Sequence, residues 1–374
     1  MPDIFKKKIE ELLKGSDVKI NGKRPWDIKV YDEKMFKDVV LGGSLAVGDA
    51  YVDKRWDCKD LSQMMTRIFQ ADITNKINVN IFSIALWLKC NIANLQLGKK
   101  AYEIGERHYD KGNELFKRML DSRMTYTCGY WKNAKNLEDA QGNKLRLICK
   151  KLMMKPKMKF LDIGSGWGSL ILYAAENYGV EATGVTVSKE QHDLNKVKSK
   201  GLKVNVLYKD YREIHGQYDV IASVGMFEHV GPKNHRKFMK KVFSLLKPDG
   251  LFLLHTIGKN RSTTSGDPWI TKYIFPNSVI PSAKQIAKAS EKLFVIKDWH
   301  AFPDTYYAKT LQAWRDNVKK NKKYLLSIGY DERFFRMWEF YLASSQASFA
   351  TGHNHLWQIV FAKPKHHIGY ESVR

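Results

Sequence analysis

Apolar residues recur along the first part of the chain in patterns typical of helices and short strands. Residues 4–14 carry apolar side chains on one side of a predicted helix. Residues 18–23 contain an Asn-Gly turn signal and apolar side chains alternate over 26–30, so this stretch predicts two short strands. Glycine-rich positions at 42–44 and 48–50 break the pattern. We therefore expect a small N-terminal α+β module of about 70 residues.

The next segment, residues 60–97, has apolar positions at three- and four-residue steps and predicts mostly helix. Its most apolar part, residues 77–95, is interrupted by asparagine, serine and lysine. That excludes a membrane-spanning helix, which needs about 20 mostly apolar residues. Two interpretations stay open: a helix that lies on a bilayer with Trp87 at the interface, or a helix packed between two domains.

Beyond residue 157, short apolar runs alternate with amphipathic segments. The runs predict strands at residues 158–163, 181–187, 204–208, 218–223, 251–256, 294–299 and 356–361. Helices are predicted after Gly168, from Lys189, over 234–246 and across 304–349. This alternation is typical of a parallel, doubly wound sheet. The predicted fold class is therefore α/β, with a doubly wound, mostly parallel sheet and a small N-terminal α+β domain.

The change of pattern also suggests domain boundaries. We expect an N-terminal domain over residues 1–97 that could contact lipid or a second copy, a linker at 98–105, and a catalytic domain over 106–374. A chain of 374 residues has room for two domains, or for one large domain with an appendage, and it can bury a full core.

Charge narrows the class of partner. The chain carries 63 lysine and arginine residues against 39 acidic ones, a formal net charge of +24, which favours a nucleic acid or an anionic membrane. The N-terminus lacks the apolar core of a signal peptide. The four cysteines form no Cys-x-x-Cys pair, which is typical of a reducing cytoplasm. His353 and His355 have no evident third ligand, so no metal site is predicted.

A glycine-rich sequence follows the first strand of the α/β region. Asp162 lies two residues before the first of Gly164, Gly166 and Gly168, and a helix is predicted directly after them. Glycines at such a turn let the backbone approach a ligand at the helix N-terminus. The GxGxG spacing differs from the GxGxxG of dinucleotide-binding proteins. It resembles the first motif of S-adenosylmethionine-dependent methyltransferases.

Polar residues at the ends of the next two strands suit the same ligand. Thr186 and Gln191 could bind ribose hydroxyls, at a point where NAD-dependent enzymes would place an acidic residue. Asp210 could accept a hydrogen bond from the adenine amine, and Tyr211 could cover the adenine face. Because the carboxyl ends of parallel strands meet at one edge of a sheet, these residues and the glycine loop predict one cofactor site.

Further motifs make the resemblance to one family specific. They lie at residues 108–116, 124–131, 184–188, 225–231, 254–258, 267–269, 273–277 and 356–358. In this order and spacing, the chain resembles bacterial cyclopropane-fatty-acyl-phospholipid synthases, relatives of the mycolic acid cyclopropane synthases, over nearly its whole length. The resemblance implies a Rossmann-like methyltransferase domain, a homodimer, and Tyr126 and Thr127 as further cofactor contacts.

The resemblance also implies a reaction. The methyl group of S-adenosylmethionine passes to the cis double bond of an unsaturated phospholipid acyl chain, and loss of a proton closes a cyclopropane ring. A bicarbonate ion would be the base, held by Cys128, Glu228, His255, the backbone of Ile257, and Tyr307. Glu228 and His255 follow the fourth and fifth strands of the α/β region, where ligands of such sheets bind. Glu228 could also take the proton directly, and both possibilities stay open.

The double bond of this substrate lies inside a bilayer. The expected location is therefore the cytoplasm, at the inner face of the membrane, with peripheral attachment to an anionic surface. Three alternatives remain: an enzyme that makes methyl-branched lipid or methylates a small amine, a nucleic-acid methyltransferase, and a non-catalytic lipid-binding scaffold. The chain has no Asn/Asp-Pro-Pro-Tyr-like signature of base methylation, so nucleic acid is not the expected partner.

Overall fold

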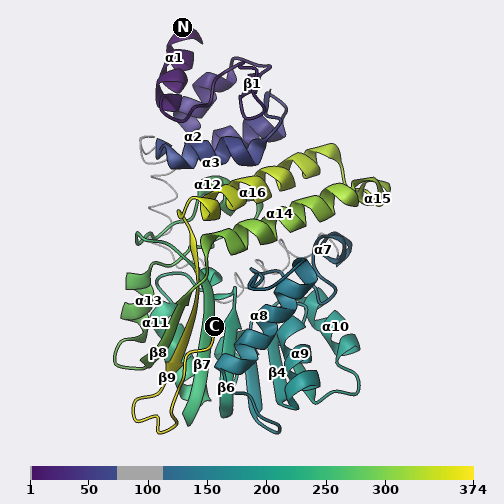
Figure 1. The fold of residues 1–374 in the computed structure, drawn as a ribbon, viewed down its shortest axis with the longest axis vertical. Coiled ribbons are helices and arrows are strands. Elements are labelled where there is room, and N and C mark those ends of the chain that lie inside the picture. The colour runs from purple at the N-terminus through teal and green to yellow at the C-terminus, as the bar shows by residue number, and fades with distance from the viewer. Residues whose placement is uncertain (1, 74–112) are drawn as a thin grey trace. The chain divides into compact units, whose positions relative to one another are not determined.

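The computed structural model describes residues 2–73 and 113–374. These residues form two compact units, each built from segments that are distant in the sequence (Figure 1). The mainly helical unit contains residues 2–73, 264–276 and 307–354, and the sheet unit contains residues 113–263, 277–306 and 355–374.

The predicted domain boundaries followed the chain, whereas the two units do not. The predicted catalytic domain includes residues 264–276 and 307–354. In the structure, these two segments pack with the N-terminal helices. The predicted linker at 98–105 lies outside the described residues, as do residues 74–97 of the predicted helical segment. The division into functional domains stays a prediction.

A seven-stranded sheet forms the centre of the sheet unit, in the order β5-β4-β3-β6-β7-β9-β8. The first five strands in this order run parallel, and the strand β9 is antiparallel to both of its neighbours. The strands are β3 (Lys159–Ile163), β4 (Glu181–Thr186), β5 (Val204–Tyr208), β6 (Tyr218–Val224), β7 (Leu246–Gly258), β8 (Val295–Ala301) and β9 (His355–Ala362). The helical elements are α7 (Asn113–Met119), α8 (Leu137–Lys151), α9 (Ser169–Tyr178), α10 (Lys189–Lys198), η1 (Tyr211–Glu213), η2 (Phe227–His229), α11 (His235–Leu245) and α13 (Ala283–Ser290). The predicted doubly wound, mostly parallel sheet is confirmed.

Two hydrophobic cores, one on each face of this sheet, explain the apolar runs in its central strands. Phe252 and Leu254 of β7 belong to the core that includes α11 and α13. Leu251 and Leu253 of the same strand belong to the core that includes α8 and α9 (Figure 1). Alternate side chains of a strand point to opposite faces, so a sheet covered on both sides requires continuous apolar runs.

The mainly helical unit joins N-terminal and C-terminal segments. Its elements are α1 (Pro2–Leu13), β1 (Lys29–Val30), α2 (Met35–Val52), β2 (Trp56–Asp57), α3 (Leu61–Gln70), α12 (Pro268–Tyr273), α14 (Asp304–Lys320, which begins in the sheet unit), α15 (Lys322–Ser327) and α16 (Glu332–Ala350). The guanidinium of Arg336 on α16 lies 4.0 Å from the centre of the Tyr51 ring. It also donates hydrogen bonds to the carbonyl oxygens of Tyr51 and Trp56, at 2.8 and 3.0 Å. One cation therefore joins residues about 280 positions apart in the chain.

Two predictions for the N-terminal segment are only partly right. The break predicted at 42–44 is present, because Gly43 has a non-helical φ of +58° and ψ of −140°, and the two parts of α2 meet there at a kink. Glycine adopts this conformation without strain. The break predicted at 48–50 is wrong, since α2 continues through these positions to Val52. The predicted strand at 18–23 is reduced to a single bridge between Ile20 and Ile28.

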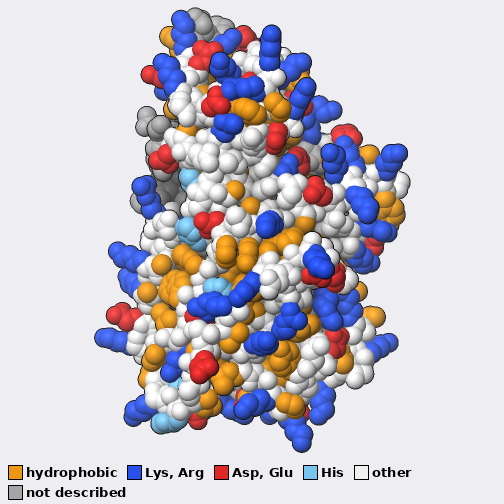
Figure 2. Space-filling view, in the orientation of Figure 1, with side chains coloured by type: hydrophobic (Ala, Val, Ile, Leu, Met, Phe, Trp, Pro, Cys, Tyr) orange, Lys and Arg blue, Asp and Glu red, His pale blue; other side chains and the backbone are white. Residues whose placement is uncertain are grey.

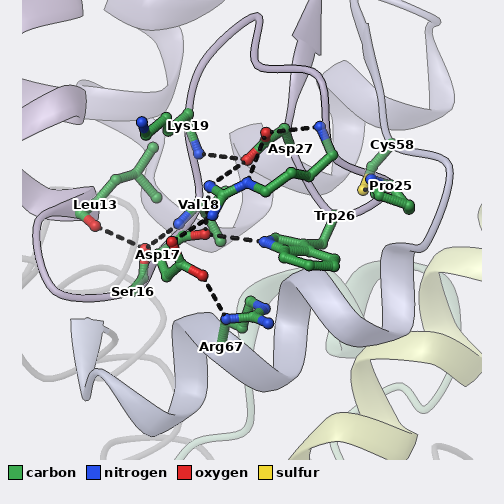
Figure 3. Close-up of polar contacts among 11 residues, drawn as sticks. Leu13, Ser16, Asp17, Val18, Lys19, Pro25, Trp26, Asp27, Cys58 and Arg67 are labelled. Atoms are coloured by element: carbon green, nitrogen blue, oxygen red, sulfur yellow. Dashed lines mark hydrogen bonds and ion pairs between the residues drawn. The ribbon is translucent and has the colours of Figure 1, made fainter.

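The side chain of Asp27 explains why that strand does not form. Its buried carboxylate accepts hydrogen bonds from the backbone nitrogens of Lys19 and Arg24, at 2.9 and 3.0 Å (Figure 3). Gly22 lies so close to this carboxylate that a Cβ atom would overlap it. Backbone groups that a hairpin would pair are bound by a side chain instead, and the segment closes into a loop.

A buried group of charges lies in the sheet unit, between α8 and β8. The Nζ atom of Lys151 lies 3.2 Å from Oδ2 of Asp298, and both side chains are almost completely buried. Asp298 also accepts a hydrogen bond from the guanidinium of Arg374, at 2.6 Å. Because a buried charge is costly without its partner, this pair should be sensitive to single substitutions.

We therefore expect Asp298→Ala to lower the free energy of unfolding by about 3–5 kcal/mol, because Lys151 would stay buried without its carboxylate. The double variant Lys151→Met/Asp298→Ala should recover much of this loss, since no unpaired ammonium remains. Urea denaturation followed by circular dichroism measures both variants. Equal instability of the single and double variants would contradict the interpretation.

Candidate active site

The glycine loop between β3 and α9 depends on its glycines. Gly164, Gly166 and Gly168 have φ angles of +86°, +54° and +83°. A Cβ atom at Gly164 would lie 2.7 Å from Met226, so a side chain there would clash. The side-chain amide of the buried Asn195 donates to the carbonyl of Gly166 at 2.8 Å. The loop is thus a fixed turn at the start of a helix, the position at which ligand sites of this kind lie.

A buried acid and a buried lysine lie beside this loop. Asp162 of β3 is 2% exposed, and its Oδ1 atom has no hydrogen-bond partner in the described part of the chain. Burial raises the pKa of Asp162 to about 7, against the opposing effect of the positive charge of Lys144. Lys144 on α8 is fully buried, and burial lowers its pKa to about 8. The charge of each group lowers the free-energy cost of burying the charge of the other.

The predicted cofactor residue Tyr126 lies next to the glycine loop. Its ring centroid is 6.5 Å from that of Trp167, a loop residue, and both rings pack against Phe116 of α7. The indole nitrogen of Trp167 donates to the side-chain oxygen of Asn113 at 2.8 Å. Aromatic contacts therefore connect α7, the segment at Tyr126 and the glycine loop.

Thr127 is held from two sides. Its hydroxyl accepts a hydrogen bond from Nζ of Lys144 at 2.7 Å, and its carbonyl oxygen accepts one from the amide of Gln141 at 2.8 Å. A Cβ atom at Gly225, directly after β6, would lie 2.6 Å from the Thr127 methyl group. Residues 126 and 127 are thus fixed between α8 and the end of β6.

The two predicted ribose ligands at the end of β4 bind each other. The hydroxyl of Thr186 donates to the side-chain oxygen of Gln191 at 2.8 Å, and both residues are buried. The same hydroxyl accepts a hydrogen bond from the backbone nitrogen of Ser188 at 3.1 Å. The residues are brought together as predicted, with their orientation fixed before any ligand binds.

Asp210 and Tyr211 follow β5, and Asp210 is already paired. Its carboxylate accepts hydrogen bonds from Nε and Nη2 of Arg212, at 2.7 and 2.6 Å. The ring of Tyr211 packs edge-on against Phe238, with a centroid distance of 5.3 Å. Arg212 was not among the predicted site residues. It fixes the carboxylate, and adenine recognition by this pair stays a prediction.

Glu228 lies in η2, after β6, and is tied to β7. Its Oε1 atom accepts a hydrogen bond from the backbone nitrogen of Ile257 at 2.7 Å. Its Oε2 atom is buried and has no partner among residues 2–73 and 113–374. Burial raises the pKa of Glu228 to about 7. The predicted backbone contact of Ile257 is thus made with Glu228 itself.

His255 lies in β7, two residues before Ile257, and is 1% exposed. Its Nδ1 atom lies 3.2 Å from the side-chain nitrogen of Gln358 on β9, and its Nε2 atom is buried with no partner in the described structure. The ring packs edge-on against Phe302. Burial is the main reason why the pKa of His255 lies well below its usual value. The ring is therefore neutral.

The other two predicted bicarbonate ligands have separate surroundings. Cys128 is completely buried in the sheet unit, and its thiol donates to the carbonyl of Gly129 at 3.2 Å. Tyr307 belongs to the mainly helical unit, where its ring stacks on Phe349 with a centroid distance of 4.2 Å. Cys128, Glu228, His255 and Ile257 therefore share one unit, and Tyr307 lies in the other.

Several polar residues of the site were not predicted. Lys144 and Gln141 lie one turn apart on α8. This helix contains further lysines, and the sequence does not indicate that Lys144 is buried beside the site. Asn195 lies on a polar helix. Gln358 could have been found, because it is a polar residue inside the otherwise apolar strand β9.

Comparison with known proteins identifies the family. The family model described as "Mycolic acid cyclopropane synthetase" matches residues 96–359. The chain belongs to this family. It is 44% identical over 353 residues to the "Cyclopropane-fatty-acyl-phospholipid synthase" of Escherichia coli (strain K12), with coverage of 94% of this chain and 92% of that protein.

Two solved structures agree with this assignment. The cyclopropane synthase MmaA2 from Mycobacterium tuberculosis has a TM-score of 0.65 and 29% identity, and the match covers 70% of this chain and 98% of that one. The mycolic acid cyclopropane synthase CmaA1, complexed with SAH and CTAB, has a TM-score of 0.65 and 28% identity with the same coverage. The predicted methyltransferase fold is confirmed, and this member of the cyclopropane synthetase family is an enzyme of the methyltransferase class.

The raised pKa of Glu228 predicts a pH-dependent cost of folding in this family member. The folded carboxyl keeps its proton up to about pH 7, whereas the unfolded one loses it near 4.5. Folding therefore takes up a proton in this window, and stability falls as the pH rises. Glu228→Gln removes this effect, so its free energy of unfolding relative to wild type should rise by up to about 3 kcal/mol from pH 4.5 to 7.5.

Urea denaturation at both pH values measures this difference. The control is Glu213→Gln, which changes an exposed glutamate of the same unit. If the difference in free energy of unfolding between Glu228→Gln and wild type does not vary with pH, folding does not raise the pKa of Glu228.

Proposed function

We propose that this enzyme transfers the methyl group of S-adenosylmethionine to the cis double bond of an unsaturated phospholipid acyl chain and closes a cyclopropane ring. The observation that carries the proposal is the 44% identity, over nearly the full length of both chains, to a protein named for that product. SAH in the related CmaA1 structure supports the cofactor.

The glycine loop fits S-adenosylmethionine. Gly164 has a positive φ, and a Cβ atom there would lie 2.7 Å from Met226, so this turn can form only with glycine. The unpartnered oxygen of Asp162 marks an unfilled polar position beside the loop. The residues that would hold the cofactor are Tyr126, Thr127, Asp162, Gly164, Gly166, Gly168, Thr186, Gln191, Asp210 and Tyr211. The bound cofactor would supply the methyl group.

Glu228 and His255 would hold the base of the proposed reaction. The two atoms Oε2 of Glu228 and Nε2 of His255 are buried and lack partners within the described ranges. Bicarbonate carries both a hydroxyl and an anionic oxygen, so it would satisfy an acceptor and a donor at once. It would supply the base that accepts the proton lost on ring closure. Cys128 and Tyr307 complete the proposed set of ligands.

Glu228 itself is the alternative base. Its pKa near 7 makes it a stronger base than an ordinary glutamate. The removal of dissolved carbonate separates the two possibilities, because only the bicarbonate version depends on it.

Peripheral attachment to an anionic membrane and assembly as a homodimer belong to the same proposal. Support for attachment comes from the net charge of +24. Figure 2 shows lysine and arginine side chains over much of the visible surface. In residues 2–73 and 113–374, no helix combines the length and apolar character needed to cross a bilayer. The expected location is the cytoplasmic side of the membrane.

The decisive experiment is an incubation with methyl-labelled S-adenosylmethionine and vesicles of an unsaturated phospholipid. Mass spectrometry of the fatty acids should show a labelled cyclopropane ring, whereas methyl-branched chains or unlabelled lipid would contradict the proposal.

Gly164→Val should abolish cofactor binding and product formation, because the valine side chain would clash with Met226. Gly142→Ala is the matched control, since a Cβ atom at this position of α8 meets nothing within 4 Å.

Carbonate dependence tests the base. Rigorous removal of dissolved carbonate should slow the wild-type enzyme, and added bicarbonate should restore its rate. Glu228→Gln and His255→Ala should lose most turnover and still bind S-adenosylmethionine, measured by calorimetry. Full activity without carbonate would assign the proton to Glu228 instead.

A further inference from the structure

Gln358 lies beside His255 because of the strand register. The strand β9 runs between β7 and β8, and Gln358 is the cross-strand partner of His255 on one side and of His300 on the other. Cross-strand partners lie on the same face of a sheet, so three polar side chains form a row across three strands. All three residues are buried, and Gln358 is completely so.

The side-chain amide of Gln358 lies against the ring of His255. The amide nitrogen lies 3.2 Å from Nδ1 of His255. An amide nitrogen only donates hydrogen bonds, so Nδ1 accepts. Burial, together with the positive charges of Lys144 and Lys151, keeps the pKa of His255 well below its usual value and the ring neutral. A neutral imidazole whose Nδ1 accepts must carry its proton on Nε2.

We propose that Gln358 is a positioning residue that holds His255 as the Nε2–H tautomer, so that His255 donates a hydrogen bond in the active site and is not the base. This inference rests on the proposed function and narrows its chemistry. The proton lost on ring closure then goes to bicarbonate or to Glu228, because His255 has no acceptor left on either ring nitrogen.

Two buried atoms without partners in the described ranges mark where a ligand would bind. A buried N–H without an acceptor costs stability, and Nε2 of His255 has no partner in the described chain. Oε2 of Glu228 is in the same state. Two hydrogen bonds tie the loop of Glu228 to the strand of His255. The backbone nitrogen of Ile257 donates to the carboxylate of Glu228 at 2.7 Å, and the backbone nitrogen of Gly225 donates to the carbonyl of His255 at 2.9 Å. A donor and an acceptor at joined strand ends suit a ligand with both an oxyanion and a hydroxyl.

The neighbouring histidine in the row repeats the arrangement. Nζ of Lys151 lies 3.0 Å from Nδ1 of His300. An ammonium group only donates, so this Nδ1 also accepts. Asp298 holds Lys151 from the other side at 3.2 Å. Both histidines of the row therefore have a fixed donor at Nδ1.

Nitrogen-15 NMR of the full chain labelled in histidine tests the tautomer without any substrate. The signals that disappear in His255→Gln identify His255. In the wild type we expect its Nε2 to be protonated and its Nδ1 to be unprotonated. A protonated Nδ1 in the wild type would overturn the proposal.

Gln358→Glu places an acceptor against Nδ1. The proton should then appear on Nδ1, and kcat should fall by at least about 100-fold, while KM for S-adenosylmethionine changes little. Gln358→Met keeps a similar volume without the hydrogen bond, so both tautomers should appear and kcat should lie between the two. An unprotonated Nδ1 in Gln358→Glu, or a single unchanged tautomer in Gln358→Met, would overturn the proposal.

Ile359→Val is the matched control, because it changes the next buried residue of β9, on the opposite face. It should lower the thermal midpoint and leave the His255 signals and kcat unchanged. If Gln358→Glu does not fold, the wild-type and Gln358→Met spectra still decide. An Nε2–H signal in an enzyme that forms no cyclopropane supports the tautomer and contradicts the proposed function. Cyclopropane formation with a protonated Nδ1 supports the proposed function and contradicts the proposed tautomer.

Discussion

The joined ends of β6 and β7 hold the candidate active site together. Gly225, after β6, donates to the carbonyl of His255, and Ile257 donates to the carboxylate of Glu228. These two hydrogen bonds fix the loop that carries Glu228 against the strand that carries His255. The same loop also leaves no space between Gly225 and Thr127. The proposed base position and the position of Thr127 therefore depend on one strand pair.

The site is unusual in how many ionisable groups it buries. Asp162, Lys144, Glu228 and His255 are each 5% exposed or less. Burial disfavours the charged form of each, so the two carboxyls hold protons at higher pH and the lysine and histidine lose them at lower pH than usual. The proposed reaction develops positive charge on an alkene, and a site closed to water suits it, because water would trap the cation.

The two compact units show why site residues cannot be assigned by following the chain. Segments 264–276 and 307–354 interrupt the sheet unit in sequence and pack with the N-terminal helices. Tyr307 goes with them, while Tyr306 stays in the sheet unit. The contacts of Arg336 with Tyr51 and Trp56 make this pairing of distant segments specific. Side-chain complementarity between distant segments sets the division.

The sequence by itself determined the sheet, its strands and the order of the site motifs, because apolar periodicity and glycine spacing are local and strong. It could not show that Asp27 would close residues 19–27 into a loop, or that α2 would continue through positions 48–50. It also gave no sign that Lys144 would be the buried lysine beside Asp162. The tertiary structure alone decided which polar groups face one another. Gln358 meets His255 only because β9 pairs with β7 in one register, and a shift by one residue would turn Gln358 to the other face.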